Sequence, residues 1–305
     1  MSDNLTFDRS RDAEPGVAVE VAPGVRRVLA PNPSPFTFTG TNTYVVGRGR
    51  VAIVDPGPRS EAHLAALLAA VKSETVEAIV VTHSHLDHVG GLAALQAAVG
   101  APVYGAGPHR PFRALEEGEG ALLDASSDGA YRPDVGVADG ETISGDGWAL
   151  TAVATPGHTA NHLAFALPGA GTLLSGDHVM AWSTSIVAPP DGAMAPYMAS
   201  LRKLMARDED VYLPGHGPRL AQARTFVRHL VGHRLMRETA ILARLKEGER
   251  RAPDLVAELY RGLDPGLAGA AALSVFAHLE DLVARGLAET DGTPRLGGVY
   301  RLGRG

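Results

Sequence analysis

The stretch His83-Ser84-His85-Leu86-Asp87-His88 places three imidazoles and one carboxylate within six residues of the chain. It directly follows the short apolar run 78–81, whose β-branched residues predict a buried strand. Apolar residues at helical spacing over 89–99 predict a helix after it, with Gly90 and Gly91 in the first turn. The cluster therefore lies on a turn between a strand and a helix, where α/β folds bind their ligands.

The spacing within this cluster predicts two neighbouring metal ions. His83 and His85 are two residues apart, so an extended backbone points both side chains the same way. Asp87 and His88 follow where the chain has begun to turn, so they can face a second point. Imidazole and carboxylate ligands suit zinc, and also iron and manganese. We therefore expect one ion on His83 and His85, and a second ion on Asp87 and His88.

Four more polar residues stand just past the ends of predicted strands. Asp55 closes the run 51–54, where a carboxylate can either end the strand in a turn or hold a ligand histidine in the right tautomer. His158, Asp177 and His216 each follow a short apolar run and lie beside glycine, which lets the backbone approach a crowded centre. Strands that end together bring their following turns together, so we expect these side chains to join the cluster.

Two predicted helices carry further candidates. The helix predicted over 61–71 carries His63, which we expect to face solvent. A second helix carries an apolar stripe that favours a core position over a cofactor site. This stripe consists of Met194, Tyr197, Met198, Leu201, Leu204 and Met205. Trp182 and Tyr197 are candidates for the wall of a substrate pocket.

The composition excludes several classes of protein. The chain has no cysteine, so disulfides, iron–sulfur clusters, thiolate zinc sites and cysteine nucleophiles are excluded. Residues 1–20 are polar without the apolar core of a signal peptide, and no window is long enough to span a bilayer. The net charge of −6 argues against binding nucleic acid over the whole surface. We expect a cytoplasmic enzyme without a membrane partner, and the sequence leaves its oligomeric state open.

At this point the sequence resembles the metallo-β-lactamase superfamily, over roughly residues 20–220. Its pattern is an acidic residue, then HxHxDH, a separate His, a separate Asp and a last His. Here these are Asp55, His83, His85, Asp87, His88, His158, Asp177 and His216. The resemblance implies an α/β fold with α+β character, a four-layer αβ/βα sandwich with the metals at one edge. It also implies that His83, His85 and His158 bind one ion, that Asp87, His88 and His216 bind the other, and that Asp177 bridges them.

Further features indicate which branch of the superfamily the sequence resembles. Aspartate at 177 is similar to the glyoxalase II-like branch, and the 39 residues from Asp177 to His216 leave no room for the cap domain of nucleic-acid-processing members. The segments Gly40-Thr41-Asn42-Thr43-Tyr44, Pro189-Pro190-Asp191-Gly192 and His233-Arg234-x-x-Arg237-Glu238 resemble the β-lactamase-like protein 2 group. That group carries a C-terminal winged-helix-like domain. Its known members divide between endoribonucleases on single-stranded RNA and hydrolases of thioesters or other small esters.

The C-terminal part agrees with this resemblance. Helices are predicted near 225–245, 253–260 and 270–284, and two short strands follow, in winged-helix order. We divide the chain into a catalytic domain, 1–220, and a helical winged-helix-like domain, 221–305. From Ala221 onward 13 Lys and Arg face 10 Asp and Glu, a net charge of +3, which is a weak signal for nucleic-acid binding. A lid or packing module is the interpretation we favour.

The resemblance and the residues together predict a metal-dependent hydrolase. Two divalent ions, zinc or else manganese or iron, would turn a bridging water into the attacking hydroxide near neutral pH. Asp87 is the candidate catalytic residue that orients this nucleophile and takes up its proton. We expect a small thioester, ester or lactone as substrate; the alternatives are cleavage of single-stranded RNA and, third, an iron-dependent sulfur dioxygenase. Specificity is expected to lie in the loops 36–44, 105–140 and 180–195.

Overall fold

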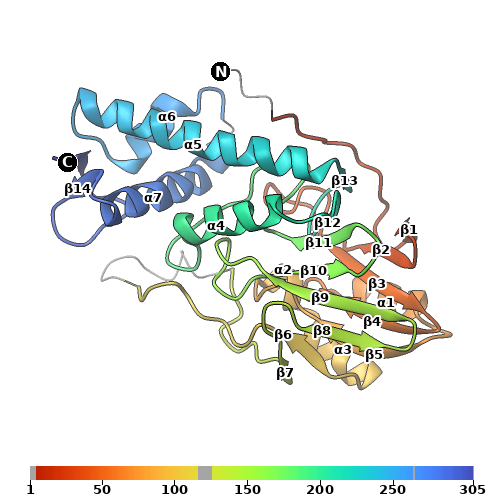
Figure 1. Cartoon of the computed structure of the whole chain (residues 1–305). Helices are drawn as coiled ribbons and strands as arrows, with labels where there is room; N and C mark the ends of the chain where they lie inside the picture. Colours follow the sequence, from red (N-terminus) through yellow and green to blue (C-terminus); the bar gives the residue numbers. More distant parts are fainter. Residues whose placement is uncertain (1–4, 116–125, 264, 305) are drawn as a thin grey trace.

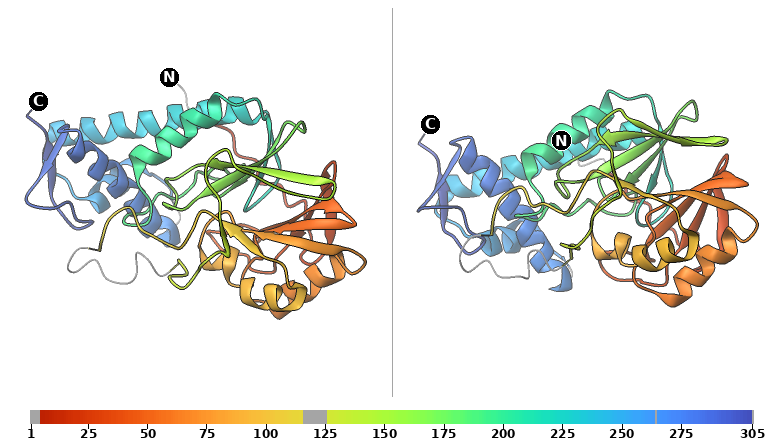
Figure 2. Two further views of the ribbon diagram at one scale, coloured as in Figure 1. Left: turned by 60° about the horizontal axis from the view of Figure 1, so that its bottom comes forward. Right: turned by 90° about the horizontal axis from the view of Figure 1, so that it is seen from below.

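The computed structural model describes residues 5–115, 126–263 and 265–304, so part of the predicted specificity loop 105–140 lies outside the described residues. Two β-sheets face one another, helices cover the outer face of each sheet, and a smaller helical part lies at one end (Figure 1; Figure 2). This is the four-layer sandwich expected from the sequence. Within the described ranges no helix is long and apolar enough to cross a membrane.

The first sheet has seven strands, hydrogen-bonded in sequence order. β1 to β4 pair antiparallel, whereas β4 to β7 pair parallel and therefore need crossovers. α1 (Glu61–Ala70) joins β4 to β5, and α2 (Leu86–Val89) with α3 (Leu92–Val99) joins β5 to β6. The strands are β1 (Ala18–Ala22), β2 (Val25–Leu29), β3 (Asn42–Arg48), β4 (Arg50–Val54), β5 (Thr75–Val80), β6 (Val103–Gly105) and β7 (Val135–Gly136).

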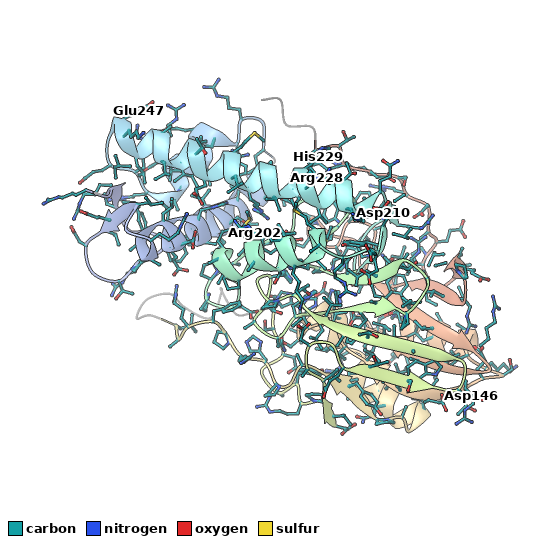
Figure 3. The ribbon with its side chains drawn as sticks, in the orientation of Figure 1. Asp146, Arg202, Asp210, Arg228, His229 and Glu247 are labelled. Atoms are coloured by element: carbon teal, nitrogen blue, oxygen red, sulfur yellow. The ribbon has the colours of Figure 1, made fainter. Side chains whose placement is uncertain are left out.

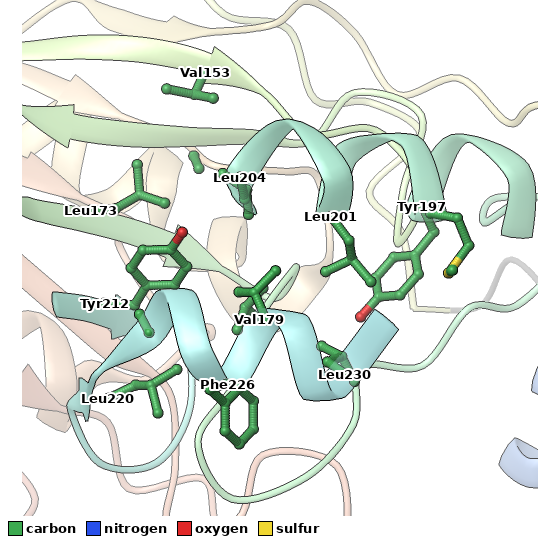
Figure 4. Packing of buried hydrophobic residues seen from close by; sticks show 14 of the residues in the cluster. Val153, Leu173, Val179, Tyr197, Leu201, Leu204, Tyr212, Leu220, Phe226 and Leu230 are labelled. Carbon is green, nitrogen blue, oxygen red and sulfur yellow. The ribbon is translucent and has the colours of Figure 1, made fainter. Parts of the chain in front are cut away.

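The second sheet has six strands in the order β13-β12-β11-β10-β9-β8, of which only β11 and β12 are paired in parallel. α4 (Met194–Met205) crosses over between β11 and β12, and packs with α5 (Ala223–Glu247) on the outer face of this sheet (Figure 4). The predicted apolar stripe lies in this contact, so its assignment to the core is confirmed. The strands are β8 (Thr142–Gly145), β9 (Trp148–Ala154), β10 (Leu163–Leu167), β11 (Thr172–Gly176), β12 (Val211–Pro214) and β13 (Leu220–Ala221).

An apolar layer between the two sheets fixes their relative position. Val54 and Val80 contribute from the first sheet, and Leu150, Phe165 and Leu174 from the second, each at most 1% exposed. Burial of such a side chain stabilises the fold by about 1.5–3 kcal/mol. The layer therefore holds the strand ends of both sheets together along one edge.

The C-terminal part follows the predicted order of helices and then a hairpin. Its elements after α5 are α6 (Ala252–Leu259), the 3₁₀ turn η2 (Pro265–Leu267), α7 (Ala268–Ala284), β14 (Ala288–Thr290) and β15 (Tyr300–Leu302). Phe276 and Tyr300 are buried in a hydrophobic cluster of this part. α5 contributes Leu230 to the cluster on the outer face of the second sheet and Ile241 to the C-terminal cluster, so this one helix belongs to both clusters. The division at residue 220 stays a prediction.

Some local expectations differ from the structure. The helix predicted over 89–99 is two helices, because α2 already ends at Val89 and α3 begins at Leu92. A Cβ on Gly90 would lie 2.7 Å from the amide nitrogen of Arg59, so this glycine lets the turn after β4 approach closely. The strands β7, β8 and β13 were not predicted, since two to four residues give no usable alternation. His63 does not face solvent; it is 1% exposed.

Candidate metal centre

Every side chain that the sequence predicted as a ligand or its support lies just past the carboxyl end of a strand. Asp55 follows β4, and the segment 83–88 follows β5. In the second sheet His158 follows β9, Asp177 follows β11, and His216 follows β12. Because the two sheets are packed face to face, these turns meet at one edge of the sandwich. The structure therefore brings the predicted residues together.

Three histidines form a first set of converging nitrogens. The Nε2 atom of His83 and the Nε2 atom of His158 each lie 3.0 Å from the Nδ1 atom of His85. The three rings are grouped closely enough for one ion to reach all of them. These are the residues that the resemblance implies for the first ion.

A second set consists of Asp87, His88 and His216. The Nε2 atoms of the two histidines lie 3.3 Å apart. One carboxylate oxygen of Asp87, Oδ2, lies 3.1 Å from Nε2 of His216 and 3.7 Å from Nε2 of His88. These three side chains are also grouped closely enough to share one ion.

Asp177 lies between the two sets. Its Oδ2 is 3.7 Å from Nε2 of His158 in the first set and 3.3 Å from Nε2 of His216 in the second. Its Oδ1 is 3.4 Å from Nε2 of His88 and has no hydrogen-bond partner among the described residues, although it is buried. A buried carboxylate oxygen without a partner is costly. This position fits a carboxylate that bridges two cations.

Hydrogen bonds on the outer side of each ring fix which nitrogen points inward. In the second set, Nδ1 of His88 donates to the Asp55 carboxylate at 2.9 Å, and Nδ1 of His216 donates to the Gly40 carbonyl at 3.1 Å. In the first set, Nδ1 of His158 donates to the Ile186 carbonyl at 2.7 Å. Carbonyl and carboxylate oxygens only accept, so the proton of each ring lies on the outer nitrogen.

The carboxylate of Asp191 holds His85 in the same way. Its Oδ2 accepts from Nε2 of His85 at 3.2 Å and from the Ser127 hydroxyl at 2.7 Å. His85 therefore presents Nδ1 to the first set, whereas the other histidines present Nε2. Asp191 was not predicted as part of the site; the only signal was the segment Pro189-Pro190-Asp191-Gly192. Asp55, by contrast, has the outer role that was considered for it.

The protonation pattern is the test of whether a metal fits. In the first set, the inward nitrogens of His83, His85 and His158 all carry lone pairs when the rings are neutral. Lone pairs 3.0 Å apart repel one another unless a cation or a proton lies between them. The second set adds two carboxylates to its lone pairs. Both sets therefore have the chemistry of divalent-ion sites of the kind that bind zinc, manganese or iron. The seven ligand assignments stay a prediction.

The charges at the second set favour a bound cation. Burial opposes protonation of His216, but the carboxylates of Asp177 and Asp87 outweigh it and raise its pKa to about 10. In the first set, burial and the neighbouring His85 lower the pKa of His158 to about 4. A proton thus occupies the second set where a metal is absent, so metal binding there must release protons.

Two further buried histidines lie beside the centre. Nε2 of His162 accepts from the backbone N–H of Asp177 at 3.1 Å, and its Nδ1 donates to the Thr155 hydroxyl at 2.8 Å. His162 therefore positions the bridging residue through its backbone. His178 packs against the ring of Tyr197, with ring centroids 4.6 Å apart, and holds no predicted ligand through its side chain.

Comparison with known proteins gives the class of this chain. Residues 36–216 match the family described as the metallo-beta-lactamase superfamily, and residues 252–296 match the beta-lactamase associated winged helix domain. The chain belongs to the metallo-β-lactamase superfamily, whose members are generally hydrolytic enzymes that bind divalent metals.

Individual relatives agree with the resemblance to the β-lactamase-like protein 2 group. The chain is 32% identical to a beta-lactamase-like protein 2 homolog of Caenorhabditis elegans over 250 residues, 79% of this chain and 78% of the relative. It is 30% identical to the atrochrysone carboxyl ACP thioesterase of Aspergillus fumigatus over 236 residues, 75% and 67% of the two chains. A solved metallo-beta-lactamase family protein of Thermus thermophilus has a TM-score of 0.73 at 26% identity, covering 93% of this chain and 100% of that one.

Proposed function

We propose that this chain is a metal-dependent hydrolase of a small thioester or a related ester. The observation that carries this proposal is the convergence of two ligand sets around Asp177, whose buried Oδ1 has no hydrogen-bond partner among the described residues. The thioester class is supported by the 30% identity to an ACP thioesterase over 75% of this chain. Two divalent ions, in our proposal zinc, would supply Lewis acidity and lower the pKa of the attacking water.

Asp87 is the residue that we propose to act on the attacking water. Its side chain is 28% exposed, whereas the other proposed ligands are at most 13% exposed. Burial alone would raise the pKa of Asp87, but the charges of His88 and His216 hold it well below its usual range. The ionised carboxylate can therefore orient a water molecule at the mouth of the site and receive its proton.

The remaining side chains hold this arrangement in place. Asp177 would keep the two sets together, and His162 fixes its backbone. Asp55 and Asp191 accept from the outer nitrogens of His88 and His85, which aims one ring of each set at its ion. This support leaves Asp87 as the most accessible acidic group of the centre.

Cleavage of single-stranded RNA remains the alternative, and its argument is the net charge of +3 in the C-terminal part. Four of the 13 cations of this part are engaged in ion pairs. The pairs are Arg244–Glu247, Arg250–Glu258, Arg285–Glu238 and Arg301–Asp291. A phosphate backbone would have to compete with carboxylates at these four arginines only, since exposed Arg224 and Arg228 form no ion pair with a described carboxylate. The preference for a small substrate therefore rests on the similarity to a thioesterase and not on these charges.

A paired assay on the metal-loaded protein tests the proposal. We would measure hydrolysis of an acyl thioester beside cleavage of labelled single-stranded RNA, for the wild type and Asp177→Ala. The matched control is Asp146→Ala. Asp146 is exposed on the turn between β8 and β9, at the end of β9 opposite to His158 (Figure 3). We expect thioester turnover that only Asp177→Ala abolishes. RNA cleavage with the same dependence on Asp177, and no thioester turnover, would refute the proposal.

A further inference from the structure

A buried cation on α5 has no anionic partner among the residues that the structure describes. Arg234 is 3% exposed and interrupts the apolar face of the helix between Leu230 and Ile241. One of its terminal nitrogens, Nη2, donates to the Ser185 carbonyl, and the guanidinium lies 5.1 Å from the ring centroid of Tyr197. Its Nε has no hydrogen-bond partner, and no carboxylate among the described residues forms an ion pair with it. Burying a charge without a counter-ion is costly.

This guanidinium lines a cavity of about 180 Å³, which we call the Arg234 pocket. Its walls come from the segment 180–186, from α5, from Arg9, Pro35 and Phe36, and from the stretches 260–263 and 267–274. The described lining includes two arginines, Arg9 and Arg234, and no acidic residue. The indole N–H of Trp182 also lines it and is buried without an acceptor among the described residues. Two donors without acceptors in one pocket are suited to the oxygens of an anion.

The Arg234 pocket shares walls with the metal centre. Ile186 lines the pocket, and its carbonyl accepts from His158 of the first ligand set. Trp182 lines the pocket and packs so closely on Gly217 that a Cβ there would lie 2.5 Å from its ring. Gly217 follows His216 of the second set directly. The pocket therefore adjoins residues that touch both candidate ligand sets.

A second arginine, Arg237, and a buried histidine, His278, lie beside the pocket. His278 is 1% exposed, and burial together with the charges of Arg234 and Arg237 holds its pKa well below the usual value. The guanidinium carbon of Arg237 lies 4.0 Å from the ring centroid of Tyr260, which lines the pocket. Like Arg234, Arg237 forms no ion pair with a described carboxylate. Glu238 and Asp281 pair with Arg285 instead. Arg234 and Arg237 are thus not paired with a carboxylate of the described chain.

We propose that the Arg234 pocket binds an anionic oxygen group of the substrate, a carboxylate or a phosphate, away from the bond that is cleaved. The proposal rests on the proposed hydrolase function and adds the charge of its substrate. The anionic group can belong to the acyl chain or to the thiol that leaves. Arg234 acts here as a specificity residue, because it selects charged over uncharged thioesters of the same size.

The first test compares two matched pairs of thioesters on the metal-loaded protein. Glutaryl and pentanoyl thioesters of N-acetylcysteamine differ in charge on the acyl side, and pentanoyl thioesters of phosphopantetheine and pantetheine differ on the thiol side. We expect Arg234→Met to lower kcat/KM about 30-fold or more for the charged member of one pair, and less than about threefold for its uncharged counterpart. The pair that responds identifies the side that carries the anion. Equal losses, or none, for charged and uncharged members of both pairs would overturn the proposal.

Two controls keep this test decisive. Arg228→Met removes an exposed arginine of the same helix (Figure 3) and should change no substrate preference. Arg234→Lys keeps the charge where the methionine variant does not fold, and should retain part of the preference. The wild-type protein must in any case prefer the charged member of one pair.

A binding measurement separates this proposal from the proposed function. Calorimetric titration of the metal-loaded protein compares phosphopantetheine with pantetheine, and glutarate with pentanoate, for the wild type and Arg234→Lys. We expect the more highly charged ligand of one pair to bind at least about tenfold more tightly to the wild type, and this advantage to shrink in the variant. Thioester hydrolysis without any charge preference would refute the pocket alone. A charge preference in binding without thioester hydrolysis would refute the hydrolase function alone.

Discussion

Replacing Asp191 by asparagine should weaken one ion of the pair and leave the other in place. The carboxylate accepts from Nε2 of His85, and His85 belongs only to the first ligand set. Asparagine keeps an oxygen that can accept this hydrogen bond but removes the negative charge. The side chain stays oriented, because the Ser127 hydroxyl also binds it at 2.7 Å. The variant thus removes charge with little change of shape.

The expected loss follows from the geometry. Removing such an outer partner typically lowers metal affinity by about 10–100-fold, or roughly 1.4–2.7 kcal/mol. The distance from Asp191 to His85 is 3.2 Å, and the His85 side chain is 13% exposed. Asp55 lies 2.9 Å from His88, and both side chains are at most 3% exposed. We therefore expect Asp191→Asn to lower the affinity for the first ion about 10-fold. Asp55→Asn should lower the affinity for the second ion by about 100-fold.

Chelator competition with zinc measures the affinities for the first and the second ion separately. The metal content is determined at each chelator concentration for the wild type, the two variants and Asp146→Asn as an exposed control. The reasoning would be refuted if Asp191→Asn weakened both ions equally, or if it cost more affinity than Asp55→Asn.

Three other perturbations test the centre and the fold. Asp177→Ala should lower the metal content below two ions per chain and reduce hydrolysis by at least about 100-fold, because the bridging carboxylate is lost; elemental analysis and kinetics measure this. Burial lowers the pKa of His63 to about 4, below its unfolded value of about 6.5, so the unfolded chain binds the proton first. The free energy of unfolding should then fall by about 2 kcal/mol from this group between pH 7 and pH 5, and urea unfolding of His63→Gln should show a weaker pH dependence. Gly157→Ala places a Cβ in a steric clash with the Cα of Tyr197 at φ +144° and should cost more than about 3 kcal/mol. Gly169→Ala, at φ +74° with open space around it, should cost only about 1 kcal/mol, and thermal unfolding of the two glycine variants measures the difference.

The candidate ligands could be predicted because each depends on local sequence. A short apolar run predicts a strand, and a His or Asp directly after it is placed at the strand's carboxyl end without knowledge of the rest of the fold. His158, Asp177 and His216 satisfy this condition. The shared edge then follows from the packing of two sheets. The geometry of His83 and His85 follows in the same way from a spacing of two residues.

The supporting residues could not be predicted, because their role depends on contacts between distant segments. Asp191 and His85 are 106 residues apart, and the segment 180–193 is neither helix nor strand, so it carries no periodic pattern. Arg234 lies on a helix that was predicted, but its burial depends on where that helix crosses the segment that contains Ser185. The role of Asp55 was left open, since an aspartate directly after a strand can either end the strand in a turn or accept a hydrogen bond from a ligand histidine.

The segment 180–193 connects the C-terminal part to the metal centre. Arg234 of α5 donates to the carbonyl of Ser185, and the next carbonyl, that of Ile186, accepts from His158. Further along, the same segment supplies Asp191 to His85. Two of the three rings in the first ligand set are thus oriented by one segment that α5 holds in place. The outer partners of the second set, Asp55 and Gly40, belong instead to the opposite sheet and its loops.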